Sequence, residues 1–194
     1  SPSVHQHMEF DQLTIIFNGE IYNFAELKLE LEKSGYSFIS HSDTEVVLKA
    51  YHCWGKDAVH KFIGMFSIAI IDHSKEKLVL IRDRAGIKPL YYYHKDGLFL
   101  FASELKCFHR HPAFCKEIDF SSVAMFLELG YVPQPNCIFN NAKKLRPGHC
   151  LELSLKNREI IESQYWDIKK FYNLPKLDIS EDEAVDQTEK LLRS

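Results

Sequence analysis

The order of hydrophobic and polar positions along the chain shows two patterns, and each predicts one kind of element. Short runs of β-branched and aromatic residues between turn-forming residues predict strands. The strand candidates are residues 13–17, 65–72, 77–81, 90–93, 98–102, 150–155 and 158–163. Because the first run ends at Asn18 and Gly19, a dipeptide with strong turn chemistry, we expect that strand to stop there.

Apolar residues at helical spacing predict the helices. Several helix starts have the spacing of a capping box, in which a polar residue is followed three positions later by a glutamate. These pairs are Asn23 with Glu26, Ser42 with Glu45, and Ser180 with Glu183. We therefore expect helices over residues 23–35 and 42–55 and from residue 180 onward, with further helices over 104–109 and 121–129.

The central strand candidate, residues 65–72, is apolar at nearly every position, whereas a strand with one solvent-facing side would alternate with polar residues. We expect it to be covered on both faces. The turn-rich segments 73–76, 82–89 and 95–97 have lengths that suit antiparallel hairpins. Together with the helices, this pattern predicts an α+β fold.

Composition and charge exclude several classes of protein. The chain has 194 residues, enough for one buried core, with 45% hydrophobic and 26% charged residues. A net charge of -3 without a basic stripe argues against nucleic acid as a partner. No apolar run approaches the ~20 residues that a membrane helix needs. The N-terminus also lacks a charged-then-apolar signal pattern, so we expect a cytoplasmic location. The five cysteines are odd in number and irregularly spaced, so we expect reduced thiols.

Separated motifs carry a resemblance to a known family. They read FNGEIYNF (residues 17–24), SDTEVV (42–47), RDRAGIKPLYY (82–92) and FASELK (101–106), with supporting matches at residues 64–66, 144–149 and 165–167. In this order and spacing the chain resembles the class II glutamine amidotransferase domain of glutamine-dependent asparagine synthetases. Short motifs are weak evidence singly, but their agreement in order is specific.

The resemblance implies a fold, a division of the chain and partners. The fold is the αββα four-layer sandwich of N-terminal-nucleophile hydrolases, here missing its first strands. Residues 1–168 are expected to be the amidotransferase domain, incomplete at its N-terminus, and residues 169–194 a linker and the first helix of an absent ATP-dependent synthetase domain.

The implied substrate is L-glutamine. ATP and Mg are expected in the synthetase domain, and no cofactor in this one. The chain would contact that domain of the same polypeptide, and a homodimer is a further expectation.

Hydrolysis of the glutamine amide requires donors to a developing oxyanion and charged groups that bind the amino-acid end. By the resemblance, the side-chain amide of Asn18 and the backbone N–H of Gly19 form the oxyanion hole. The plain alternative is a strand-ending turn. Asp43 is the implied ligand of the substrate ammonium, unless it only interacts with the helix dipole. Glu20 is a second substrate-binding candidate, with a structural salt bridge as its alternative.

In the family, the nucleophile is an N-terminal cysteine whose own α-amino group acts as the base, and it precedes the motif that begins here at Phe17. Ser1, followed by Pro2, is not expected to replace it. The arginine that binds the substrate carboxylate in the family also lies upstream, so we expect this chain to bind glutamine much more weakly. We therefore expect this chain to be inactive alone.

Several other polar residues are expected to be structural. Arg82 and Arg84 should brace the loop of residues 83–89, in which Gly86 permits an unusual backbone angle, and Glu104 should close the core side of the pocket. A group of possible zinc ligands is crowded too closely for a tetrahedral site and is interpreted as a polar helix end followed by a turn. The group consists of Cys107, His109, His111 and Cys115.

Two alternative functions remain open at this point. The chain could be a degenerate, non-catalytic amidotransferase-like module that only binds its synthetase partner. It could also belong to a related enzyme that amidates a carboxylate other than aspartate.

Overall fold

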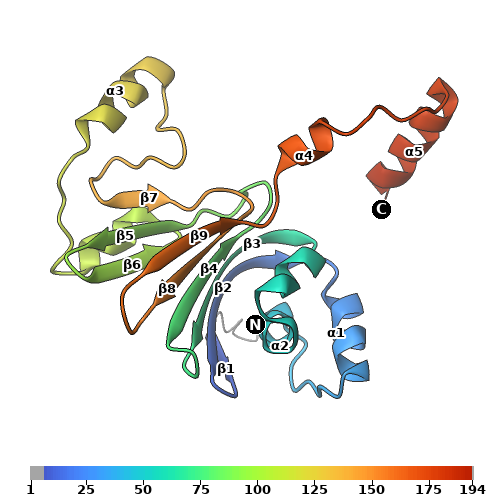
Figure 1. The fold of residues 1–194 in the computed structure, drawn as a ribbon, viewed down its shortest axis with the longest axis horizontal. Helices are drawn as coiled ribbons and strands as arrows, with labels where there is room; N and C mark the ends of the chain where they lie inside the picture. Colours follow the sequence, from blue (N-terminus) through green and yellow to red (C-terminus); the bar gives the residue numbers. More distant parts are fainter. Residues whose placement is uncertain (1–6, 194) are drawn as a thin grey trace.

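The computed structural model describes residues 7–193, which form two antiparallel sheets and flanking helices (Figure 1). The larger sheet has six strands in the order β1 (His7–Phe10), β2 (Leu13–Ile21), β3 (Gly64–Asp72), β4 (Lys77–Arg82), β8 (His149–Ser154) and β9 (Ile160–Gln164). The smaller sheet has three strands in the order β6 (Leu98–Ala102), β5 (Tyr91–Lys95) and β7 (Ala142–Lys144). The predicted hairpins β3–β4 and β5–β6 are confirmed, whereas β4 and β5 lie in different sheets.

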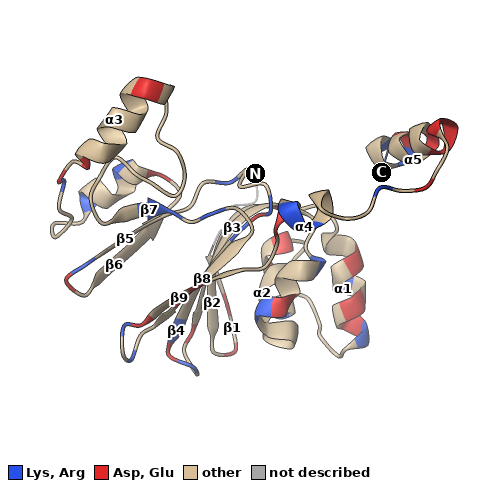
Figure 2. Cartoon of the chain, turned by 45° about the horizontal axis from the view of Figure 1, so that its top comes forward, with Lys and Arg blue, Asp and Glu red and all other residues tan. Residues whose placement is uncertain are grey.

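Helices lie between and after these strands along the chain. The α-helices are α1 (Phe24–Lys33), α2 (Asp43–Trp54), α3 (Phe120–Leu129), α4 (Ile168–Tyr172) and α5 (Glu181–Arg193). Two 3-10 helices are η1 (Gly55–Lys61) and η2 (Leu105–Arg110). None of the helices described between residues 7 and 193 is long and apolar enough to span a bilayer. Charged side chains lie mostly on the helices and at the turns between strands (Figure 2).

Separate clusters of buried side chains show how these elements stack. The first cluster packs α1 and α2 against one face of the larger sheet, through residues such as Leu31, Val47 and Ile15. The second lies between the two sheets, where Leu80 meets Tyr92. The third covers the outer face of the smaller sheet with η2 and the loop after it. The chain is thus a four-layer α+β sandwich whose fourth layer is a 3-10 helix and a loop.

The central strand β3 is covered on both faces, as predicted. Ile68 and Ile70 point into the helix-side cluster, and Ala69 points into the cluster between the sheets. Alternate residues of a strand face opposite sides, so this division places β3 at the middle of the sandwich. A one-residue slip of β3 would exchange the two faces.

Local signals near residues 18–23 were misleading. The prediction that the first strand stops at Asn18 and Gly19 is wrong, because β2 continues to Ile21, paired with Gly64 of β3. The capping-box prediction for Asn23 is also wrong. Its side chain donates to the Lys61 carbonyl and accepts from the backbone N–H of Ile63, which fastens the start of α1 to the end of η1 and the residue before β3. In both cases tertiary pairing decides the local structure.

The other helix predictions largely hold. The Ser42 side chain accepts a hydrogen bond from the Thr44 N–H and caps α2. The capping box of Ser180 and Glu183 is present in both directions at the start of α5. The helix predicted over residues 104–109 is instead the 3-10 helix η2.

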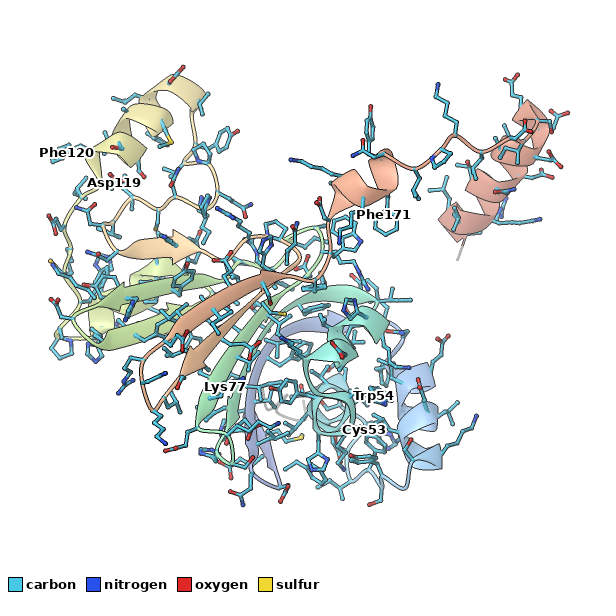
Figure 3. All side chains as sticks on the ribbon, in the orientation of Figure 1. Cys53, Trp54, Lys77, Asp119, Phe120 and Phe171 are labelled. Atoms are coloured by element: carbon cyan, nitrogen blue, oxygen red, sulfur yellow. The ribbon has the colours of Figure 1, made fainter. Side chains whose placement is uncertain are left out.

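Helices α3, α4 and α5 project from the sandwich (Figures 1 and 3). Phe120, at the start of α3, is 81% exposed, and Tyr172 at the end of α4 is 90% exposed. Phe171 packs on Trp166, with ring centroids 6.0 Å apart, and so ties α4 to the end of the core. These helices carry an unusual amount of exposed apolar surface for a folded domain.

Candidate active site

A cavity of 390 Å³ lies where β2 and β3 meet the end of β6. The described residues that line it are Ile16, Asn18, Ser67, Ile68, Ala69, Leu90, Phe101, Ala102, Ser103, Glu104 and Cys107. A largely apolar pocket with a few polar groups is typical of small-molecule sites. Of the predicted site residues, Asn18 is among these lining residues, whereas Gly19, Glu20 and Asp43 are not.

The Asn18 side chain links the two sheets at this cavity. Its Nδ2 donates a hydrogen bond of 2.9 Å to Oγ of Ser103, which follows directly after β6. An amide nitrogen carries two hydrogens, so one donor of Asn18 remains free of this contact. The bond to Ser103 holds the amide in one orientation beside the cavity, as preorganised stabilisation of an oxyanion requires.

The backbone N–H of Gly19 points to the edge of β2 that faces away from β3. Opposed residues in an antiparallel pair either exchange both hydrogen bonds or exchange neither. Gly19 lies opposite Phe66, and both backbone groups of Phe66 bond to Asp83 instead, at 3.3 Å and 2.9 Å. The pair therefore exchanges no hydrogen bond, and the Gly19 N–H is directed to the opposite side.

Close packing of two backbones leaves no room for a side chain at Gly19. A β carbon at this position would lie 2.2 Å from the Met65 carbonyl oxygen and 2.7 Å from the α carbon of Phe66. On the facing strand, a β carbon at Gly64 would lie 2.1 Å from the Glu20 carbonyl oxygen. Glycine at position 19 is thus required by strand packing, and the strand-ending turn is not its explanation.

Asp43 is the first residue of α2 and reaches the same edge of β2. Its Oδ2 accepts a hydrogen bond of 3.1 Å from the backbone N–H of Ile21. Ile21 lies two residues after Gly19, so the N–H groups of both residues point to the same side of the strand. The Gly19 N–H and the Ile21 N–H, to which Asp43 bonds, are therefore about 6.6 Å apart, the length of two residues of extended chain. A carboxylate in the first turn also interacts favourably with the helix dipole.

Glu20 is exposed, and its side chain makes no hydrogen bond or ion pair with the residues that the structure describes. The salt bridge considered as its structural role is therefore absent from residues 7–193. Its place in the strand puts its side chain on the same face as that of Asn18, because the two residues are two positions apart.

Two arginines brace the loop after β4. Arg82 donates to the carbonyls of Lys88 and Gly86, both at 2.8 Å, and Arg84 donates to the Phe62 carbonyl at 2.6 Å. These bonds confirm the bracing role predicted for the arginines. Gly86 has φ 69°, the conformation expected from the sequence, and a β carbon there would lie 2.7 Å from the Pro147 ring.

The other residues considered in the sequence lie away from the edge of β2 that carries the Gly19 N–H. Glu104 and Cys107 line the cavity, and Glu104 forms an ion pair of 2.5 Å with Lys106. Between residues 7 and 193, no group of three or more His, Cys, Asp or Glu side chains is arranged to hold a metal ion. All five cysteines are free thiols. Ser1 lies outside the described residues.

A second carboxylate near the start of α2 was not identified as functional from the sequence. Glu45 is 1% exposed and accepts from the backbone N–H groups of Ile39 and Ser40, from the Ser40 hydroxyl and from Lys49. Burial alone would raise the pKa of Glu45, but these hydrogen bonds outweigh it and lower that pKa to about 2. The spacing of Ser42 and Glu45 gave a signal, but it indicated a capping box, and Glu45 bonds instead to the preceding loop.

Ser103 is the other residue that the sequence did not single out. It lies inside the FASELK motif, next to Glu104, which was considered there as a structural residue. Only the stacking of the two sheets brings it to Asn18, across 85 positions of sequence.

Two antiparallel sheets stacked between helical layers, with a cavity at the end of the central strands, define the fold of class II glutamine amidotransferases. The structure superposes on glutamine phosphoribosylpyrophosphate amidotransferase from Bacillus subtilis with a TM-score of 0.54 at 19% sequence identity. The match covers 82% of this chain and 31% of that one. This likeness confirms the predicted fold of the N-terminal-nucleophile hydrolase type.

Sequence comparison gives the family. Residues 1–166 match the glutamine amidotransferase domain, and the chain belongs to this family. It is 38% identical over 181 residues to a putative glutamine-hydrolysing asparagine synthetase 2 of Methanocaldococcus jannaschii, covering 90% of this chain and 35% of the relative. It is 37% identical over 160 residues to the glutamine-hydrolysing asparagine synthetase 3 of Bacillus subtilis, covering 82% of this chain and 26% of the relative. The chain thus spans only part of the length of these relatives.

Substitution of Gly19 by alanine tests the close approach of β2 and β3. The added methyl group would overlap the Met65 carbonyl, so we expect Gly19→Ala to lower the free energy of unfolding by about 1–3 kcal/mol. Urea denaturation measures this change. The neighbouring variant Glu20→Ala, which alters an exposed side chain, should change stability by less than about 0.5 kcal/mol. Equal stability of Gly19→Ala and the unmodified chain would contradict the described packing.

The lowered pKa of Glu45 predicts a pH dependence of stability. A carboxylate whose pKa is lower in the folded state stabilises the fold above its unfolded pKa, and this contribution is lost as the pH falls toward the folded pKa. For Glu45 the loss is expected between about pH 4.5 and about pH 2. In Glu45→Gln this component should be missing, so the difference in unfolding free energy between the two proteins should shrink over that range. A difference that stays constant from pH 7 to pH 2 would rule out the ionised, hydrogen-bonded Glu45.

Proposed function

We propose that this chain is the glutaminase portion of an asparagine synthetase and that it binds L-glutamine along the edge of β2. Asn18 and Gly19 supply the donors to the amide oxygen as it becomes an oxyanion, and Asp43 binds the substrate ammonium. Glu20 is a second substrate-binding group at the exposed end of the strand. The nucleophile in this proposal is the N-terminal cysteine of such domains.

One observation carries the proposal: the Gly19 N–H, which has no hydrogen-bond partner among residues 7–193, points to the same edge of β2 as the Asp43 carboxylate. The amide oxygen and the ammonium nitrogen of an extended glutamine lie roughly 6 Å apart, five bonds along the chain. A comparable distance, about 6.6 Å, separates the N–H group of Gly19 from the N–H group of Ile21, to which Asp43 bonds. The Asn18 side chain, with the Nδ2 hydrogen that Ser103 does not accept, belongs to the residue next to Gly19.

The proposed division of the chain places the amidotransferase domain in residues 1–168 and a linker with the first helix of a synthetase domain in residues 169–194. That domain would hold ATP and Mg and would transfer the released ammonia to aspartate in the cytoplasm. The relatives' names, which describe glutamine-hydrolysing asparagine synthetases, support this acceptor. The exposed apolar residues of α3 and α5, such as Leu127 and Leu192, suit contact with such a domain or with a second copy.

An alternative function is a non-catalytic module that retains the fold. The orientation of Asn18 by Ser103 argues against it, because a module that only docks to a partner has no need for a fixed amide donor beside a cavity. The features described for this chain fit equally well an enzyme that amidates a carboxylate other than aspartate.

Binding of L-glutamine tests the substrate. Asp43→Asn removes the charge that pairs with the ammonium group, and loss of a charged hydrogen bond is worth about 1.5–3 kcal/mol, so the affinity should fall about 10- to 100-fold. Titration of the labelled chain with L-glutamine, followed by NMR, measures the affinity. The matched control Asp57→Asn, on the exposed side of η1, should bind like the unmodified chain. Equal affinities of the Asp43 and Asp57 variants would remove Asp43 from the site.

Ammonia release tests the reaction. A polypeptide in which this chain follows an N-terminal segment that begins with cysteine should release ammonia from L-glutamine. In it, Asn18→Ala should lower kcat about 100- to 1000-fold, as loss of one oxyanion donor does elsewhere. A folded polypeptide that binds L-glutamine and releases no ammonia would favour the non-catalytic module.

A further inference from the structure

We propose that Ser40 and Glu45 are positioning residues for Asp43 and that they hold the start of α2 so that the Asp43 carboxylate faces the edge of β2. The inference rests on the proposed function, because it gives these residues a part in the recognition of glutamine. The side chains of both residues bond to each other, and Glu45 also bonds to Lys49, so each would act through Asp43 and not by contact with the substrate.

A continuous chain of hydrogen bonds runs from the helix interior to the residue before Asp43. The Ser40 hydroxyl donates to Oε2 of Glu45 at 2.6 Å and accepts from the backbone N–H of Ser42 at 3.2 Å. Ser42 in turn caps α2 by accepting from the Thr44 N–H at 3.2 Å. The residues on both sides of Asp43 are therefore fixed by bonds that begin at Glu45.

Lys49 anchors this chain in the core. Its Nζ bonds to Oε1 of Glu45 at 2.5 Å and to the carbonyl of Ser37, and both side chains of the ion pair are almost fully buried. The ammonium also lies over the rings of Phe10, at 5.0 Å, and Phe38, at 4.7 Å. The Glu45 charge is thus neutralised on one side, while its other oxygen is left to hold Ser40.

Stability alone is a weak explanation for this arrangement. Replacement of a buried ion pair by well-packed apolar residues is often neutral or stabilising, because removing two charges from water costs free energy. What the pair adds here is order in the segment of residues 36–42, which forms no helix or strand. Ile39 shows this clearly, since its side chain is 95% exposed while its backbone N–H is bound inward by Glu45.

Core packing holds the body of α2, whereas this network holds its first turn, from which the Asp43 carboxylate reaches β2. The described contact is the hydrogen bond from the Ile21 N–H, and it requires α2 to begin at the right place and angle. The Ile21 amide therefore reports directly on the Asp43 carboxylate, independently of any substrate.

The experiment compares Ser40→Ala with the unmodified chain by NMR. Loss of the hydroxyl breaks the link between Glu45 and Ser42, and one such bond is worth about 1–1.5 kcal/mol, so hydrogen exchange at the Ile21 amide should rise and L-glutamine affinity should fall, each about tenfold. Ser40→Thr keeps the hydroxyl and should restore both values. Glu45→Gln should act in the same direction as Ser40→Ala. The matched control is Ser34→Ala, whose hydroxyl bonds to the Glu30 carbonyl away from Asp43 and should leave both values unchanged.

The outcomes separate this inference from the proposed function. An Ile21 amide that is unchanged in Ser40→Ala overturns the positioning role, and so does an L-glutamine affinity equal to that of the unmodified chain. Failure of Asp43→Asn to weaken glutamine binding would instead refute the proposed function. In that case a changed Ile21 amide would still show that Ser40 positions Asp43.

Discussion

The pairing of β2 with β3 is the constraint on which the site depends. Its register sets Gly19 opposite Phe66 and Ile21 opposite Gly64, and a glycine on each strand allows the two backbones to approach closely. Because side chains alternate along a strand, a slip by one residue would turn the Asn18 amide from the cavity toward the helices. The same slip would turn the Gly19 N–H toward β3. One register therefore decides the direction of both donors.

That register is held from the far side of β3 by Asp83. Its carboxylate accepts from the N–H groups of Phe66, Ile87 and Lys88, and its own N–H bonds to the Phe66 carbonyl. Asp83 thus occupies the place of a strand residue opposite Phe66 and turns the chain from the larger sheet into the loop before the smaller one. A 1% exposed carboxylate is costly unless its oxygens are bound, and here each is satisfied. The crossing between the sheets in turn brings Ser103 to Asn18.

Much of the fold could be predicted from sequence, because strands β3 and β6 and helices α2 and α3 follow from hydrophobic spacing to within a residue or two. The errors fall where tertiary contacts override local chemistry. Asn18 and Gly19 have the composition of a turn, and only the facing Gly64 reveals that they continue a strand. The contact with Ser103 could not be predicted either, since nothing in the sequence states how the sheets stack. Asn18 itself was found through its motif and not through periodicity.

The start of α2 shows how one helix terminus can serve two purposes. Asp43 and Glu45 are two residues apart, so their side chains leave the helix in different directions. Glu45 turns back to the loop and has its oxygens occupied by Lys49, Ser40 and the Ile39 N–H. Among the residues that the structure describes, Asp43 accepts one hydrogen bond, from the Ile21 N–H, and it keeps acceptor capacity for another partner. Glu45, whose oxygens are fully hydrogen-bonded, makes the start of α2 rigid. Asp43 is therefore already ordered when it binds a ligand.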